Sequence, residues 1–211
     1  MALLGTGTYR QCEGGAPQPR GCAKLGALLL LVLVVGGGWP ASKPAAIAAE
    51  PPLSALENDL KAALLAAFPR YVDWPSGGPA ADAAPIVLAV FGETNLDNEI
   101  RAAIAGKTVN GRPLVFKRAL TEAECATGCH IVYISPEERR RLPSLLNRLK
   151  DSSVLTIGES DDFLERGGII KLVRRERKFK FEVNLTAARR ARLEISSKLL
   201  KLADAVHGKT K

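Results

Sequence analysis

The chain has 211 residues, of which 46% are hydrophobic and 25% are charged, and this balance excludes a disordered protein or a repeat array. Its formal net charge of +8 would suit nucleic acid or an anionic membrane surface. Aromatic residues make up only 5% of the chain, however, and the basic residues are spread along it without a nucleic-acid-binding motif. Composition therefore indicates a globular protein whose charges form solvated faces.

The first fifty residues have the organisation of a secretory signal. Basic residues precede an apolar run at 25–35, and Ala46-Ile47-Ala48 matches the cleavage pattern of small residues. The apolar run is short for a transmembrane helix, which needs about 20 residues. We therefore expect residues 1–48 to be a signal peptide and residues 49–211 to form one exported domain, with no tight membrane insertion after cleavage. An uncleaved membrane anchor is the alternative.

An amphipathic helix is predicted at the start of this domain, and it should end before Pro69 because proline cannot continue it. One face of this helix carries Leu56, Leu60, Ala63, Leu64 and Ala67. A corner at 71–75 then concentrates aromatic residues, which pack at such corners more often than they bind ligands. A loop rich in Gly, Pro and Ala follows.

Strands and helices alternate through the middle of the chain. Short β-rich runs at 86–91, 114–117, 130–134 and 154–157 are separated by stretches with helix-capping and helical patterns. Helical crossovers between strands favour parallel pairing, because such connections are right-handed and cover both faces of a sheet. This part of the sequence therefore predicts a mostly parallel sheet flanked by helices.

The segment 166–203 predicts two further strands and a last helix. A β-rich run at 169–173 and an alternating run at 179–183 flank a charged turn, so we expect an antiparallel hairpin at one edge of the sheet. Asn184 or Thr186 is expected to cap the helix that follows. Ile195, Leu199, Leu202 and Val206 recur at helical spacing and predict its buried stripe. The predicted fold is one α/β domain with about six strands.

Polar residues follow several of the predicted strands, at the place where open α/β sheets bind ligands. Glu93, Ser135 and Asp161 occupy these positions, but each is also explained as a strand exit or a helix cap. The sequence lacks the dinucleotide, phosphate-loop and nucleophile-elbow motifs. His130 has no visible base or orienting partner and is expected to be structural. We therefore predict no catalytic residues and no cofactor.

Removal of residues 1–48 would leave Cys125 and Cys129 as the cysteines of the exported domain. Two cysteines in an oxidising compartment suggest one disulfide, which here would close a very small loop. Together with His130 they could also form half of a metal site. The other histidine is His207, near the C-terminal end, and no second cysteine pair follows, so we expect no metal.

Seven short segments, taken in order, resemble the motifs of one family. They are residues 71–75, 106–114, 128–134, 154–157, 167–170, 181–185 and 195–200. The ordered set resembles the YfiR-type periplasmic regulators of Gram-negative bacteria over essentially the whole exported domain. The resemblance implies a non-catalytic periplasmic domain that represses an inner-membrane diguanylate cyclase by binding its periplasmic sensor part. Cyclic di-GMP and biofilm formation would then fall, under control of the redox or stress state of the envelope.

The resemblance also bears on individual residues. Cys129 matches the cysteine of the family's Gly-Cys-His motif, but Ala89 stands where family members commonly carry the partner cysteine, which leaves Cys125 as the substitute. We expect Tyr71, Val72 and Trp74 to contact the partner protein, and the outer face of the predicted last helix is the alternative surface. A homodimer remains open, and export argues against nucleic acid. The alternative function is a periplasmic small-molecule-binding protein or an enzyme that uses the carboxyl ends of the strands.

Overall fold

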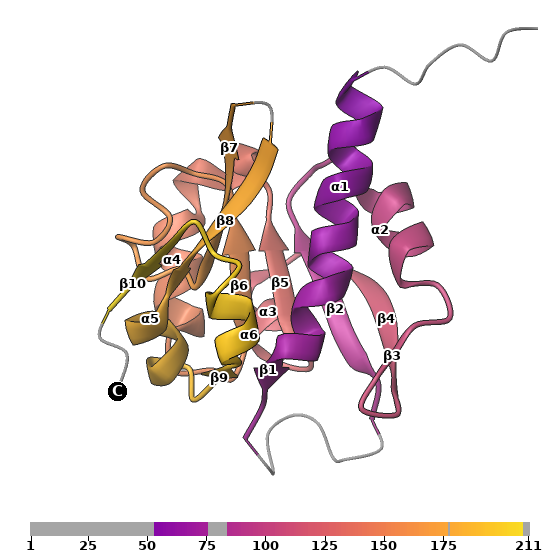
Figure 1. The fold of residues 1–211 in the computed structure, drawn as a ribbon. Helices are drawn as coiled ribbons and strands as arrows, with labels where there is room; N and C mark the ends of the chain where they lie inside the picture. Colours follow the sequence, from indigo (N-terminus) through magenta and orange to yellow (C-terminus); the bar gives the residue numbers. More distant parts are fainter. Residues whose placement is uncertain (1–52, 76–83, 177, 209–211) are drawn as a thin grey trace, which may run out of the picture. The chain divides into compact units, whose positions relative to one another are not determined.

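The computed structural model describes residues 53–75, 84–176 and 178–208, which build an α/β domain around one large sheet (Figure 1). Eight strands lie in the order β10-β8-β7-β6-β5-β2-β4-β3. Their bounds are β2 Ile86–Phe91, β3 Thr108–Val109, β4 Arg112–Ala119, β5 Ile131–Ile134, β6 Leu155–Gly158, β7 Ile170–Arg175, β8 Lys178–Asn184 and β10 Ala205–His207. A separate two-stranded sheet pairs β1 (Val72–Asp73) with β9 (Glu194–Ile195).

The central strands are parallel, as predicted. β2 pairs with β4 on one side, from Ile86↔Leu114 onward, and with β5 on the other, from Leu88↔Ile131 onward. β5 continues to β6 and β6 to β7, again in parallel. Two α-helices provide long connections between these strands, namely α2 (Asp97–Ile104) and α4 (Leu142–Leu149). A mostly parallel sheet with helical crossovers is therefore confirmed.

Helices cover both faces of the sheet. One core cluster joins Leu88 and Val90 of β2 to α1 (Leu53–Ala67), α2, α5 (Leu185–Arg190) and α6 (Ser197–Leu200). The other joins Ala89 and Phe91 to α3 (Glu122–Ala126) and α4. Successive side chains of a strand point to opposite faces, so β2 contributes to both clusters and is buried along nearly its whole length. Among the residues that the structure describes, no helix combines the length and the apolarity needed to cross a membrane.

Several helices begin with the side-chain caps that the sequence indicates. The Thr121 hydroxyl accepts from the amide of Glu124 at 3.2 Å, and the Glu124 carboxylate accepts from the amide of Leu120. Ser135 caps the 3-10 helix η2 (Pro136–Arg140), and the Asn184 side chain accepts from the amide of Ala187 at 3.0 Å. These caps satisfy amide donors that have no partner within their own helices.

The predicted C-terminal helix is wrong. The chain instead forms α5, β9, α6 and β10, because α5 ends at Arg190 and Arg192 takes a left-handed conformation with φ of 58°. Of the predicted apolar stripe Leu199 is buried, whereas Leu202 is 67% exposed. The helical spacing of these residues arises from several short elements that follow one another.

The hairpin of β7 and β8 is antiparallel as predicted, from Ile170↔Val183 to Arg175↔Lys178. It does not form the edge of the sheet, however. β10 pairs in parallel with the outer side of β8, with Val206 opposite Val183. The residues assigned to the end of a helix thus supply the edge strand.

α1 is a helix as predicted and is continued by the 3-10 turn η1 (Phe68–Tyr71), but the first two leucines of its predicted face point away from the core, while Leu64 packs against it. Leu56 and Leu60 are 50% and 45% exposed, whereas Ala62, Leu65 and Ala66 are buried. Ala62 and Ala66 are small, so their side of the helix can approach the sheet and α2 closely. The size of the side chains, rather than the number of apolar residues, thus decides the face that packs.

The glycine at the end of β6 illustrates how tightly the second core cluster is packed. Gly158 ends β6 and lies against the buried ring of Phe163, which a Cβ at position 158 would overlap. We expect Gly158→Ala to lower the free energy of unfolding by about 1–3 kcal/mol through overpacking. Urea denaturation measures the change, and Phe163→Leu in the same chain should recover part of it. An unchanged unfolding midpoint for Gly158→Ala would contradict the packing described here.

Candidate functional site

The carboxyl ends of β2, β5 and β6 come together at one edge of the sheet. Two of the residues that the sequence places there are joined, because the Ser135 hydroxyl donates to the backbone carbonyl of Glu93. They line a hollow together with Thr94, Tyr133 and Lys61. Asp161 lies in a neighbouring hollow, between α1 and the β7–β8 hairpin. The structure thus groups Glu93 with Ser135 and places Asp161 in the adjoining hollow.

A charged network that the sequence did not reveal separates these two hollows. Glu159, just beyond β6, accepts from the Tyr133 hydroxyl at 2.6 Å and pairs with Lys61 of α1 at 2.9 Å. Lys61 lines both hollows, and its ammonium group lies 5.2 Å from the centre of the Phe179 ring. Burial raises the pKa of the Tyr133 hydroxyl above its ordinary value, and the Glu159 carboxylate raises it further. The network joins α1 to the ends of β5 and β6.

This edge has limited catalytic potential. The Ser135 hydroxyl is engaged with a backbone carbonyl, and Glu159 is engaged by Tyr133 and Lys61. A serine nucleophile requires a base within hydrogen-bond reach, and the Ser135 hydroxyl instead contacts the Glu93 carbonyl and the Glu137 amide. Within residues 53–75, 84–176 and 178–208, no group of three or more His, Cys, Asp or Glu side chains could hold a metal ion.

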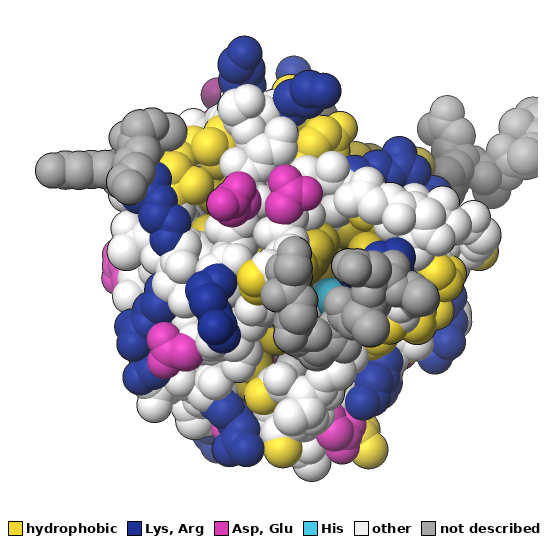
Figure 2. Space-filling model, turned by 90° about the horizontal axis from the view of Figure 1, so that it is seen from below, with side chains coloured by type: hydrophobic (Ala, Val, Ile, Leu, Met, Phe, Trp, Pro, Cys, Tyr) yellow, Lys and Arg dark blue, Asp and Glu magenta, His cyan; other side chains and the backbone are white. Residues whose placement is uncertain are grey.

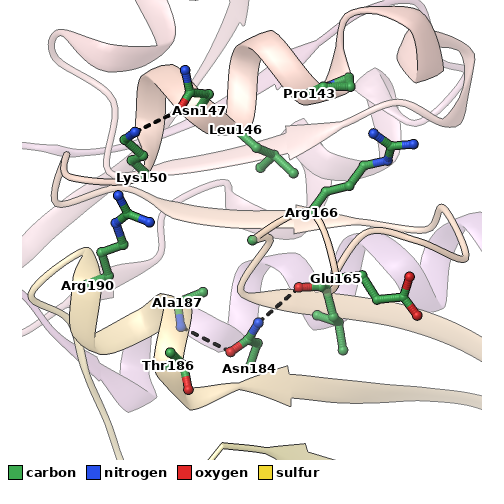
Figure 3. A pocket seen from close by; sticks show the side chains of 12 residues that line it. Pro143, Leu146, Asn147, Lys150, Glu165, Arg166, Asn184, Thr186, Ala187 and Arg190 are labelled. Carbon is green, nitrogen blue, oxygen red and sulfur yellow. Dashed lines mark hydrogen bonds between the residues drawn. The ribbon is translucent and has the colours of Figure 1, made fainter.

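A further hollow lies between α4, the segment 164–167 and α5 (Figure 3). Asn184 lies beside it and is fixed on both sides, since its amide nitrogen donates to the Leu164 carbonyl and its oxygen accepts from the Ala187 amide. The Lys150 ammonium donates to the Asn147 side chain at 2.7 Å. Arg190 pairs with Asp151 outside the hollow. Lys150, Asn184 and Arg190 are therefore each engaged by another group of the domain.

The aromatic corner predicted to bind a partner lies at the opposite, amino edge of the sheet. Val72 pairs with Ile195 in the small sheet, and the Tyr71 carbonyl accepts from the Ser196 amide. Val72 is buried in the core, whereas Tyr71 and Trp74 are partly exposed. Only these two of the three predicted residues thus present side-chain surface. Figure 2 views the molecule from this edge, where hydrophobic side chains reach the surface between scattered Lys and Arg residues.

His130 lies behind this corner, just before β5. The Trp74 ring meets the imidazole edge-on at a centroid distance of 5.9 Å. The Val87 amide donates to Nδ1 at 3.1 Å, and Nη2 of Arg112 lies 3.0 Å from Nε2. Burial and, to a smaller extent, the positive charge of Arg112 lower the pKa of His130 to about 4. The imidazole is therefore neutral at pH 7, and it has the structural role predicted from the sequence.

Cys125 and Cys129 lie at the end of α3 and just after it, and both thiols are free and fully buried in the second core cluster. The Cys129 thiol donates to the Glu124 carbonyl at 3.1 Å. Burial raises the pKa of Cys125 to about 12, with smaller contributions from Cys129 and Glu124, and burial also raises the pKa of Cys129. In the reduced state both groups are thus protonated, unreactive thiols at neutral pH.

Taken together, these features define an α/β domain in which the polar groups at both edges of the sheet are largely engaged with one another. Residues 58–204 match the family model described as YfiR/HmsC-like, and the chain belongs to that family. At the level of the family, this is a group of periplasmic regulators of cyclic di-GMP signalling.

The chain is similar to two solved structures over part of its length. One is a conserved domain protein from Vibrio cholerae, with 14% identity and a TM-score of 0.44 over 57% of this chain and 54% of that chain. The other is the ABC domain in complex with L-Trp from Streptococcus pneumonia, with 13% identity and a TM-score of 0.43 over 57% of this chain and 55% of that chain. The matches thus span about half the length of these structures, and likeness at this level carries no inference about function. No curated protein matches the chain.

His130 makes the stability of the domain depend on pH. The pKa of its imidazole is about 4 in the folded state and 6.5 in the absence of the fold, so folding favours the neutral ring. The contribution of the neutral imidazole to the free energy of unfolding is fully present above pH 6.5. It is lost as the pH falls toward 4, and the loss is up to about 3 kcal/mol. Urea denaturation between pH 7.5 and 4.5 should show a smaller loss for His130→Gln than for the unmodified protein. His207→Gln is the control, because that side chain is half-exposed beside Glu182, and an equal loss in all three proteins would contradict the assignment.

The pairing of Cys125 with Cys129 stays a prediction. In the protein isolated from an oxidising compartment, the unreduced peptide that contains both residues should lack two hydrogens and resist alkylation after unfolding. Reduction should expose both thiols to the reagent, but only once the fold is opened, because both are buried. Alkylation of both cysteines in the unfolded, unreduced protein would show that no disulfide forms.

Proposed function

We propose that this protein is a periplasmic repressor of an inner-membrane diguanylate cyclase, and that it lowers cyclic di-GMP and biofilm formation by binding the periplasmic sensor part of that cyclase. The observation that carries the proposal is the match of residues 58–204 to the YfiR/HmsC-like family. Export through the predicted signal peptide at 1–48 would bring the domain to the compartment where such a sensor lies. The domain itself performs no catalysis in this proposal.

The proposed contact surface is the aromatic corner at the amino edge. Tyr71 and Trp74 are partly exposed there, and large aromatic side chains are enriched where protein partners bind. Nε1 of Trp74 is buried and lacks a hydrogen-bond partner among the described residues, so a modest shift of the ring would let a partner's carbonyl accept from it. Arg70 is exposed beside the corner and would supply part of a polar rim.

The repression needs no chemical step. A regulator that binds the inactive state of the cyclase better than the active state shifts the balance toward the inactive state. A preference of about 1.4 kcal/mol is enough for a tenfold shift. The rigid support of Tyr71 by the β1–β9 pairing would limit the ordering cost of such a contact.

The alternative is a small-molecule-binding protein or an enzyme that uses the carboxyl edge of the sheet. Two hollows that share Lys61 lie there and favour a binding role. A ligand would have to compete with the Lys61–Glu159 pair and with the Tyr133 hydrogen bond, and the engaged hydroxyl of Ser135 argues against catalysis. This reading is therefore the weaker of the two.

Genetics in the host tests the proposal. Deletion of the gene should raise cyclic di-GMP and surface attachment, and the rise should vanish when the partner cyclase is deleted as well. Unchanged cyclic di-GMP in the single deletion, under conditions where the protein is made, would overturn the proposal.

Complementation then tests the contact surface. A Tyr71→Ala/Trp74→Ala variant should fail to restore low cyclic di-GMP, because the aromatic contact would be lost. Leu120→Ala is the matched control, since Leu120 is apolar and 71% exposed but lies beyond β4 at the other edge. Immunoblots must show equal amounts of both proteins. Full complementation by the double variant would place the contact elsewhere on the domain.

A further inference from the structure

Two parts of the domain project together beyond the carboxyl edge of the sheet. They are the N-terminal turns of α1 and the tip of the β7–β8 hairpin, at the top of Figure 1. Nη1 of Arg174 in the hairpin lies 2.7 Å from the Glu57 carboxylate of α1. The two projections therefore form one continuous surface, which we call the α1–hairpin end.

The α1 side of this surface is apolar. Leu53, Leu56 and Leu60 are 75%, 50% and 45% exposed, and their spacing places them on one face of the helix. The opposite face of α1 is buried through Leu65 and its alanine neighbours, so the helix cannot turn its leucines inward without losing that packing. Clustered exposed leucines on a folded domain usually mark a surface that contacts an apolar partner or a membrane.

The hairpin side is cationic. Exposed Arg174, Arg175, Lys178 and Lys180 surround the tip, and Glu176 is the one carboxylate among the residues described between 174 and 180. Ion pairs with Glu57, Glu182 and Asp204 hold some of these cations, yet the side chains of Arg174, Arg175 and Lys180 remain 46–57% exposed. The long side chains can thus still reach other anions while their stems stay on the domain.

We propose that the α1–hairpin end docks on an anionic phospholipid surface. The leucines enter the boundary between headgroups and acyl chains, and the hairpin cations bind the phosphate groups around them. Apolar area and positive charge act together in interfacial binding, and either one alone gives only weak, reversible attachment. In this proposal the domain lies on the bilayer surface without crossing it.

Two observations favour a membrane over a protein groove or a second copy of the chain. The surface combines exposed leucines with flexible, exposed cations, whereas the centres of protein interfaces are depleted in charge. The area of three partly exposed leucines is small for a stable dimer, which buries about 800 Å² on each partner.

Docking in this way would direct the amino edge, with Tyr71 and Trp74, away from the bilayer. The inference goes beyond the proposed function and does not depend on it, because it concerns lipid and not the cyclase. A failed lipid experiment would leave the genetic test of cyclase control unaffected, and the reverse also holds.

Co-sedimentation with vesicles tests the docking. The protein, as the host processes it, is mixed with vesicles of phosphatidylethanolamine and phosphatidylglycerol or of phosphatidylcholine alone. We expect binding to the anionic vesicles to be at least about tenfold tighter and to weaken as salt is raised from 0.05 to about 0.5 M, because the cations are solvent-exposed. Equal binding to both vesicle types, or no binding to the anionic ones, would overturn the proposal.

Variants assign the binding to this end of the domain. Leu53→Ser/Leu56→Ser should weaken binding about tenfold through the loss of apolar area, while Leu53→Met/Leu56→Met should retain it. Lys178→Glu should weaken binding several-fold, while Lys107→Glu changes the net charge equally at the amino edge and should leave binding unchanged. Urea midpoints equal to that of the unmodified protein would show that these exposed substitutions leave the fold intact.

The remaining outcomes are also decisive. Serine variants that bind anionic vesicles as tightly as the unmodified protein would overturn the proposal. If the unmodified protein dimerises without lipid and the serine pair abolishes the dimer, the leucines serve a second copy and the proposal is again wrong. Equal weakening by Lys178→Glu and Lys107→Glu would reduce the effect to net charge and would exclude this surface as the docking site.

Discussion

The pairing of β2 with strands on both of its sides is the constraint on which the rest of this domain depends. Ile86 to Phe91 pair with β4 on one side, and Leu88 to Phe91 pair with β5 on the other, while helices cover both faces of the strand. A strand in this position must be apolar nearly throughout, because neither face meets water. Once β2 is fixed, parallel pairing brings the ends of its neighbours to the same two edges, and the contacts among Lys61, Tyr133 and Glu159 follow from that alignment.

The two edges differ in character. At the carboxyl edge, Lys61, Tyr133 and Glu159 come from a helix and two separate strands and satisfy one another, which makes the edge a joint between α1 and the sheet more than an open site. At the amino edge, the imidazole of His130 is held neutral by burial and by Arg112 beneath an aromatic side chain. A domain with these properties suits regulation by surface contact, which agrees with its membership of the YfiR/HmsC-like family.

Charge is distributed on this chain in a way that its net value does not convey. The +8 of the sequence suggested scattered, solvated cations. Folding places Arg174 and its neighbours on a projecting hairpin beside exposed leucines of α1. Part of the positive charge is therefore concentrated at the α1–hairpin end. Residues 57 and 174 are far apart in the chain, and only the crossing of α1 over the sheet brings them into contact.

The sequence by itself determined the parallel α/β architecture, the strands β2, β5 and β6, the caps at Thr121 and Asn184, and the family, because each depends on a local pattern. The sequence did not show which side of α1 faces solvent. The spacing of apolar residues identifies an apolar face, but it does not show which side of the helix can approach the sheet. It also misassigned Leu199, Leu202 and Val206 to one helix, since the period of 3.6 does not distinguish one element from several short ones in succession. The Lys61–Glu159–Tyr133 network and the α1–hairpin end were decided by tertiary structure alone, because their members are up to about a hundred residues apart in sequence and meet only when long-range packing closes the loops between them.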